Sequence, residues 1–410
     1  MTGLWKWGAI SLCLVSACSS TPEGKQQELF QKALSPASVP DVPVISLSRQ
    51  WQRFLSSPFR LMAMPSQHYA SGLVPTKSLR QSGQSLTFLI EGDYLYLANG
   101  DGKVQALNLH NGHLHWQRQV ESYLTAGPGL SEKLLLLGDK EGDVLALDDQ
   151  SGAVIWRAHV DSQVLVAPVG NAQVVIVRSI DGKVYGLNAS TGKRLWVKDV
   201  SLPALTLHGG GMPLLLPDRV LVGMSNGQLL SLDWRTGKTH WAHQLAEPRG
   251  RNDLERMVDA DSPLIFSDGV VYAATYQGKL VAIEVKTGKL LWSRKFSSYT
   301  GGVLLGDSLF FSDAQSHVWA IHRKTGASLW QQDELHYRGV GRPVVINQQL
   351  VLSDHEGYLY SLSLDDGRIL NQFRLEPGAI RHFIPFSRDK LAVLNEHGIL
   401  TVARFPEFTQ

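Results

Sequence analysis

Apolar and polar residues alternate along most of this 410-residue chain in stretches of five to eight positions, and Gly-containing turns separate the stretches. The alternation is clearest in one region, where it predicts strands at 164–169, 173–178, 183–188 and 193–200. The three- and four-residue apolar spacing of helices is absent. The pattern therefore predicts an all-β protein built from short strands.

The strands are organised into a repeat. Each copy has a leading Gly, an alternating stretch, a polar turn that ends in a second Gly, and a Trp four residues later. The Trp position follows the leading residue by 14 positions in all seven copies, although Asn371 replaces Trp in the seventh. Such constancy indicates a repeat architecture. The copies begin at Gly102, Gly142, Gly182, Gly227, Gly278, Ser316 and Gly357, and Gly398 begins an incomplete eighth.

A four-stranded unit of about 40 residues cannot bury both of its faces alone, so the units must stack. Radial stacking of twisted sheets closes into a β-propeller. We expect each Trp to pack against the next blade and to donate its N–H to a carbonyl there. The turn glycines supply a positive φ. The alternative, a tryptophan platform for a carbohydrate or cofactor, is disfavoured because every unit repeats the residue.

The two ends of the chain complete the ring. The eighth copy stops at Gln410, before a fourth strand, whereas residues 44–54 form an orphaned strand that contains Trp51. We expect this strand to join the last blade and to remove the open edges. The predicted fold is an eight-bladed β-propeller of four-stranded antiparallel blades at 44–406, closed by the N-terminal strand. Residues 18–43, rich in Ser, Pro, Gln and Lys, are predicted to be a flexible tether.

The first 17 residues have the pattern of a signal peptide: Lys6, then an apolar run that is too short to span a bilayer. Val15, Ser16 and Ala17 before Cys18 resemble the lipobox of bacterial lipoproteins. That resemblance implies cleavage before Cys18 and lipidation of its sulfur, and Ser19 implies transfer to the outer membrane. The alternative is an ordinary secretory signal, which would leave Cys18 as an unexplained thiol.

Composition narrows the possible functions. Lys and Arg number 39 against 37 Asp and Glu, which gives no basic surface for nucleic acid. The only two cysteines are Cys13 and Cys18, so the folded body has neither a disulfide nor a cysteine metal site. Acidic turn residues such as Asp101, Glu141 and Asp181 lack the clustered spacing of a calcium loop and are predicted to be turn formers.

The repeat, Gly-x-(Val/Leu)-x-Ala-Leu-(Asn/Asp) followed by Thr-Gly-Lys-x-x-Trp, resembles the pyrroloquinoline-quinone (PQQ) type of propeller repeat. With the lipobox and the unit count, the whole chain resembles the BamB family of outer-membrane lipoproteins. This resemblance implies a non-catalytic scaffold of the β-barrel assembly (BAM) complex, facing the periplasm and without a cofactor. Its implied partners are the POTRA domains of BamA, other BAM subunits and unfolded outer-membrane proteins.

Two repeat intervals, of 45 and 51 residues, contain insertions near 201–213 and 244–262. Both fall between the fourth strand of one blade and the first strand of the next, so they share one rim, where loops commonly carry function. By resemblance, the BamA contacts would be Leu205, Leu207 and His208 together with Arg256, Asp259 and Asp261. His208 stands where the family pattern has Arg, which removes a fixed charge. The structural alternative is that the leucines begin a buried strand and that the two aspartates cap a turn.

The enzymatic alternative is a periplasmic PQQ-dependent dehydrogenase, since these enzymes share the propeller and the repeat. They resemble this chain in fold only. Their active sites typically need calcium, a catalytic Asp and often an adjacent cysteine pair, and the folded body here has no cysteine. The sequence also lacks the metalloprotease, nucleophile-elbow and phosphate-loop patterns. We therefore expect a binding protein with no catalytic residues.

Overall fold

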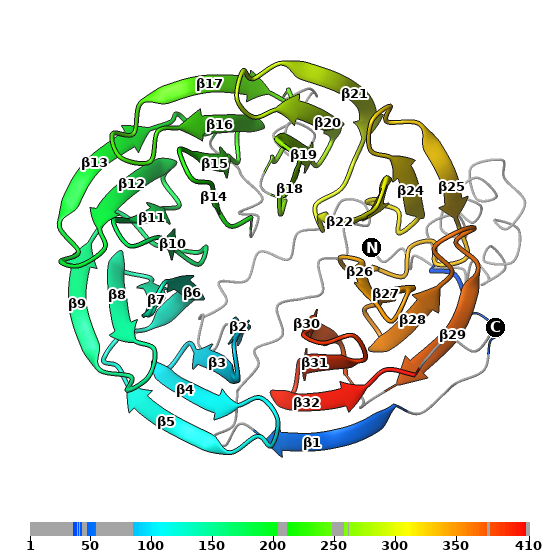
Figure 1. Ribbon diagram of the computed structural model, residues 1–410, viewed down its shortest axis with the longest axis horizontal. Helices are drawn as coiled ribbons and strands as arrows, with labels where there is room; N and C mark the ends of the chain where they lie inside the picture. The colour runs from blue at the N-terminus through cyan, green and yellow to red at the C-terminus, as the bar shows by residue number, and fades with distance from the viewer. Residues whose placement is uncertain are drawn as a thin grey trace, which may run out of the picture.

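The structure is a computed structural model that describes residues 36–38, 40, 42, 47–54, 85–203, 211–247, 258–260, 262–374 and 378–406. Within these residues the secondary structure consists of strands, which form eight four-stranded sheets. The sheets stand side by side as the blades of a ring, with the first strand of each blade nearest the axis (Figure 1). The predicted all-β, eight-bladed propeller is confirmed.

Each blade is a simple antiparallel meander, and blades 1 to 4 follow the chain in order. Blade 1 consists of β2 (Ser85–Glu91), β3 (Tyr94–Asn99), β4 (Lys103–Asn108) and β5 (Leu114–Gln119). Blade 2 consists of β6 (Leu124–Ser131), β7 (Leu134–Asp139), β8 (Asp143–Asp148) and β9 (Val154–His159). Blade 3 consists of β10 (Val169–Gly170), β11 (Val174–Arg178), β12 (Lys183–Asn188) and β13 (Arg194–Asp199). Blade 4 consists of β14 (Leu214–Leu215), β15 (Val220–Gly223), β16 (Gln228–Leu232) and β17 (Thr239–Gln244).

Blades 5 to 8 repeat the arrangement. Blade 5 consists of β18 (Ile265–Ser267), β19 (Val270–Ala274), β20 (Gly278–Glu284) and β21 (Leu290–Phe296). Blade 6 consists of β22 (Gly302–Leu305), β23 (Ser308–Ser312), β24 (Val318–His322) and β25 (Ser328–Gln332). Blade 7 consists of β26 (Val344–Ile346), β27 (Gln349–Ser353), β28 (Tyr358–Leu362) and β29 (Ile369–Arg374). Blade 8 consists of β30 (Ile380–Pro385), β31 (Lys390–Asn395), β32 (Ile399–Arg404) and, from the start of the chain, β1 (Ser48–Phe54).

The outermost strand of blade 8 comes from the other end of the chain. β1 runs antiparallel to β32, with Ser48 opposite Arg404 and Trp51 opposite Val402. Figure 1 shows β1 in blue on the outside of the red β32. The segment before β1 also contacts the ring, because Ala37, Pro40 and Val42 hydrogen-bond to or pack against blades 6 and 7. The contacts with the propeller thus begin within the predicted tether of residues 18–43.

One predicted strand is shorter than expected. In blade 3 the first strand covers only Val169–Gly170, and Val164 forms an isolated bridge to Ser179. Pro168 lies between these two points and has no backbone N–H to donate to the ladder. The other three strands of this blade lie where the alternation predicts them.

The repeated tryptophans join neighbouring blades as predicted. Trp156 in blade 2 is 7% exposed, and its Nε1 donates to the carbonyl of Ala189 in blade 3 at 2.7 Å. A Cβ added to Gly192 would lie 2.6 Å from the ring of Trp156, so this glycine is needed for the close approach as well as for its φ of +70°. The same pairing occurs at six junctions, Trp116 with Gly152, Trp156 with Gly192, Trp196 with Gly237, Trp241 with Gly288, Trp292 with Gly326 and Trp330 with Gly367.

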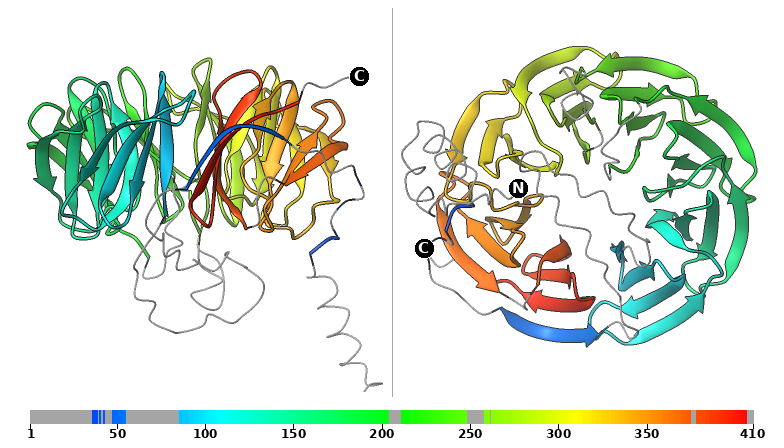
Figure 2. Two further views of the ribbon diagram at one scale, coloured as in Figure 1. Left: turned by 90° about the horizontal axis from the view of Figure 1, so that it is seen from below. Right: turned by 180° about the vertical axis from the view of Figure 1, so that it is seen from behind.

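Strand direction gives the ring two different rims, seen edge-on in Figure 2. Turns between the second and third strands, such as 139–143 and 223–228, emerge on the same rim as the connections from one blade to the next, such as 160–164. We call this the insertion rim, because both sequence insertions begin and end on it. The turns at 148–154 and 284–290 lie on the opposite rim.

Candidate partner-binding rim

The ends of both insertions meet at one turn of blade 4. Asn226, in the turn between β15 and β16, donates from Nδ2 to the carbonyl of Ser201 at the start of the first insertion, at 3.0 Å. In the same turn, the carbonyl of Met224 accepts from the backbone N–H of Ala260, near the end of the second insertion, at 3.2 Å. One turn therefore binds the described start of the first insertion and the described end of the second, so these two ends lie close together on the insertion rim.

The end of the second insertion is fixed to blade 5. Val258 and Ala260 are buried, and the carbonyl of Asp259 accepts from the N–H of Tyr276 at 2.9 Å in an isolated bridge. Ser262 donates from Oγ to the carbonyl of Ala274 at 2.6 Å. These bonds hold residues 258–260 and Ser262 against blade 5.

Asp259 is the one predicted contact residue that the structure describes. It lies on the insertion rim, as the position of its insertion implies, but it is only 5% exposed. Burial of a carboxylate is tolerated where neighbours satisfy it. Leu205, Leu207, His208, Arg256 and Asp261 lie outside the described residues, as does the predicted lipidation site Cys18.

A small recess lies beside the first insertion, between blades 3 and 4. Leu202, Met224 and Ile180 line it together with Arg178, whose side chain is buried. The Nη1 of Arg178 donates to the carbonyl of Gly223 in the next blade at 2.8 Å. The recess therefore combines an apolar wall with a guanidinium beside Leu202, near the start of the first insertion.

The sequence analysis did not single out Arg178, although its position shows a signal. It stands four residues before the leading Gly of its repeat, where the other copies have Ala, Gly, Ser or Leu. A single charged residue at a repeat position that is otherwise small or apolar is a departure that packing does not require. Comparison of the copies position by position would have identified it.

In blade 2 the acidic residue that caps the turn is Asp139, which lies two positions before Glu141. Oδ1 of Asp139 accepts from the N–H groups of Glu141 and Asp143 at 3.0 and 2.7 Å. Burial raises the pKa of Asp139 from its ordinary value, and these backbone hydrogen bonds oppose that shift. Asp181 accepts from the hydroxyl of Ser179. Over the residues that the structure describes, no group of three or more His, Cys, Asp or Glu is arranged to hold a metal ion, and no helix could cross a membrane.

The family model described as "Outer membrane protein assembly factor BamB" matches residues 100–332. A protein of that name from Pseudomonas aeruginosa is 40% identical over 380 residues, which cover 92% of this chain and 93% of the relative. The chain belongs to the BamB family. The crystal structure of BamB from Moraxella catarrhalis superposes with a TM-score of 0.73 at 26% identity, over 79% of this chain and 99% of that chain.

Quinoprotein enzymes share the fold with the BamB family. The quinohemoprotein alcohol dehydrogenase from Comamonas testosteroni matches with a TM-score of 0.64, over 90% of this chain and 80% of that chain, but at 12% identity. Identity at that level shows a common propeller architecture and nothing about chemistry. The relative from Pseudomonas aeruginosa, in contrast, is 40% identical over 92% of this chain.

Proposed function

We propose that this protein is a non-catalytic scaffold subunit of the outer-membrane β-barrel assembly complex. Membership of a family whose proteins are named outer membrane protein assembly factors supports this role. In this proposal the protein is exported by its N-terminal signal, lipidated on Cys18 and held at the outer membrane on the periplasmic side. Its partners are BamA, other subunits of the complex and unfolded outer-membrane proteins.

The proposed contact with the POTRA domains of BamA lies on the insertion rim across blades 3 to 5. The observation that carries this assignment is the shared turn of blade 4, where Asn226 and Met224 bind the ends of both insertions. A rigid blade at the base of two insertions suits partner binding, because a scaffold that is already ordered loses little further conformational entropy when the partner binds. Leu205 and Leu207 would supply the apolar centre of the interface, and Arg256 and Asp261 its polar edge.

Within this proposal Asp259 has a positioning role, and its burial supports that role. Its backbone carbonyl pairs with Tyr276, and its side chain is inside the rim, so it would hold the loop in place and not touch the partner directly. Substitution of Asp259 would therefore lower both stability and partner binding. For this reason the binding test uses Arg256 and Asp261 and leaves Asp259 intact.

The test is recovery of BamA with the affinity-tagged lipoprotein from solubilised membranes. Leu205→Ala with Leu207→Ala should lower BamA recovery at least tenfold, and Arg256→Ala with Asp261→Ala should lower it severalfold. The matched control is Leu290→Ala with Leu291→Ala, a pair of exposed leucines on the outer strand of blade 5, which should recover BamA normally. Full recovery with both folded rim variants would refute the assignment of the rim.

A further inference from the structure

A segment near the N-terminus lies along blade 7 and ends at the seam with blade 8. We call it the strap and define it by its described residues Ala37, Pro40, Val42 and Leu47. It begins at the insertion rim, where the N–H of Ala37 donates to the carbonyl of His336, in the connection between blades 6 and 7, at 2.8 Å. The strap then leads directly into β1 on the outside of blade 8.

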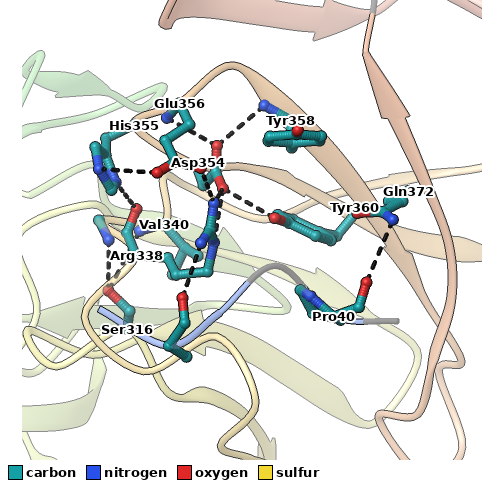
Figure 3. A network of polar contacts seen from close by, with 12 residues as sticks. Pro40, Ser316, Arg338, Val340, Asp354, His355, Glu356, Tyr358, Tyr360 and Gln372 are labelled. Carbon is teal, nitrogen blue, oxygen red and sulfur yellow. Dashed lines mark hydrogen bonds and ion pairs between the residues drawn. The ribbon is translucent and has the colours of Figure 1, made fainter. Parts of the chain in front are cut away.

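Arg338 anchors the beginning of the strap. Its side chain is 2% exposed, and its Nε and Nη2 donate to Oδ2 of Asp354 at 2.9 and 2.6 Å (Figure 3). The Tyr360 hydroxyl donates to the same carboxylate oxygen at 2.9 Å. Burial raises the pKa of Tyr360, and the charge of Asp354 adds to the rise, so the phenol remains a donor. Nη1 of Arg338 points to the strap and donates to the carbonyl of Ala37 at 2.8 Å.

Gln372, on the outer strand β29, holds the middle of the strap. This side chain is 5% exposed, and its Nε2 donates to the carbonyls of Pro40 and Val42 at 3.3 and 2.7 Å. A buried amide is unfavourable unless its donors are paired, and these two strap carbonyls are the acceptors found for it in the described part of the chain. Val42 also packs against the core between blades 6 and 7. Gln372 is therefore placed to receive a docked strap.

Leu47 completes the strap at the one described junction where the repeat tryptophan is missing. The outer strand of blade 7 has Asn371 at the tryptophan position. Leu47 is 7% exposed and packs in a cluster with Phe373 and with Phe405 from the end of the chain. The rings of Phe373 and Phe405 are 4.8 Å apart. The strap thus supplies apolar surface that six other junctions obtain from their own repeat tryptophans.

We infer that the strap is a clamp that fixes where the N-terminal lipid anchor leaves the propeller, so that blades 6 and 7 face the phospholipid surface and blades 2 and 3 face away from it. This inference rests on the proposed lipidation of Cys18. Pro36, the first described residue, follows Cys18 by 18 positions. If these residues form the flexible tether that the sequence predicts, they would span about 24 Å, which is close to the radius of gyration of about 21 Å for a compact chain of this size. The anchor therefore reaches the near side of the ring much more easily than the far side.

The test measures the distance of each side of the ring from a bilayer. The folded body contains no cysteine, so a thiol-reactive fluorophore can be attached at one introduced site. Gln315→Cys in blade 6 and Glu141→Cys in blade 2 occupy equivalent exposed turn positions on the insertion rim, four blades apart. The full-length lipoprotein, bound to phosphatidylethanolamine and phosphatidylglycerol vesicles with an acceptor dye on the headgroups, should show at least twofold higher energy transfer from Gln315→Cys. Equal transfer from both sites on bound protein would overturn the clamp.

A second comparison releases the strap without breaking the buried Arg338–Asp354 pair. Ala37→Pro removes the N–H that binds His336, and Gln372→Ala removes the donors to Pro40 and Val42. The double variant should lose most of the difference in transfer between the two sites, and protease cleavage within residues 37–47 should rise about tenfold. Gln331→Ala, an exposed glutamine on β25, is the control and should change neither value. If the double variant is cleaved more readily but, before protease is added, keeps an unchanged difference in transfer between the two sites, the clamp would be overturned.

A separate variant tests the lipid on which the inference rests. Cys18→Ser should not bind the vesicles at all. If it binds as well as the parent protein, the lipid assignment is wrong. If it is released while the parent protein shows equal transfer from both sites, the lipid assignment stands and the clamp is wrong.

Discussion

Two kinds of seam between blades can be compared in this ring. At six junctions a tryptophan from one blade packs on a turn glycine of the next and donates to a backbone carbonyl there. At the junction of blades 7 and 8, Leu47 and Phe405, which come from opposite ends of the chain, pack against Phe373. Both seams bury apolar surface between blades. The first kind is built within neighbouring repeats, whereas the second forms only when the chain ends meet, so its loss need not disrupt the remaining blades.

The largest expected effect is at a repeat seam. Trp156→Ala should lower the free energy of unfolding by about 3–5 kcal/mol, because it removes a buried indole and leaves a cavity between blades 2 and 3. Trp156→Phe keeps most of the apolar area and should lose only about 1 kcal/mol with the hydrogen bond to Ala189. Denaturant unfolding followed by circular dichroism measures both. Similar losses for the two variants would show that packing is not the main contribution of this residue.

Gly192→Ala should destabilise the same seam by about 2–4 kcal/mol. Its methyl group would lie 2.6 Å from the Trp156 ring, and the positive φ adds a backbone penalty. The matched control is Gly92→Ala in blade 1, which also has a positive φ but has nothing within 4 Å of an added Cβ. The control should lower the free energy of unfolding by about 1 kcal/mol, because only the backbone penalty of a positive φ applies there. Equal losses would mean that the close approach of the ring does not matter.

The seam between blades 8 and 1 should make stability depend on pH. His382 contacts Phe88 edge-on, with the rings 5.0 Å apart, and burial, together with the charge of Arg342, lowers its pKa to about 4. The unfolded chain protonates the His382 imidazole more readily than the folded protein does. The contribution of neutral His382 to the free energy of unfolding is therefore complete above about pH 6.5 and is lost as the pH falls toward 4. We expect a loss of about 2–3 kcal/mol over that interval.

His382→Asn should flatten this pH dependence in unfolding experiments between pH 4 and 7. His113→Asn, at an exposed turn position of blade 1, is the control and should leave the dependence unchanged. If the parent and His382→Asn proteins had the same pH profile of stability, His382 would not be the cause of the pH dependence.

The smallest expected effect is at the strap. Leu47→Ala should cost about 2 kcal/mol, at the low end for a buried leucine, because the strap can detach without unfolding the blades. Amide hydrogen exchange should therefore increase in residues 37–54, with little change in blades 2 to 5. If exchange increased equally in all blades, the two kinds of seam would not differ in the way described above.

The candidate rim was predictable only in part. Repeat intervals of 45 and 51 residues located the insertions, and strand alternation placed them on one rim. Neither feature shows that Asn226 and Met224 bind the ends of both insertions, because those contacts depend on how three blades pack. Asp259 illustrates the limit, since an aspartate in a loop is usually exposed and here it is buried. The predicted roles of Leu205, Leu207, His208, Arg256 and Asp261 stay predictions.

By itself, the sequence determined the architecture of this protein. Each blade is specified by local alternation of apolar and polar residues, by its turn residues and by the Trp–Gly spacing. The same pattern recurs in successive repeats, so the fold is still recognisable despite the short first strand of blade 3 and the Asn371 that replaces a tryptophan. The sequence also predicted that the N-terminal strand joins the last blade, whereas only the tertiary structure decided how the strap before that strand is held. The contacts of Arg338 and Gln372 with the strap join residues about 300 and 330 positions apart and occur once. Periodicity cannot reveal a contact that has no second copy, because its free energy comes from groups that meet only after the ring has closed.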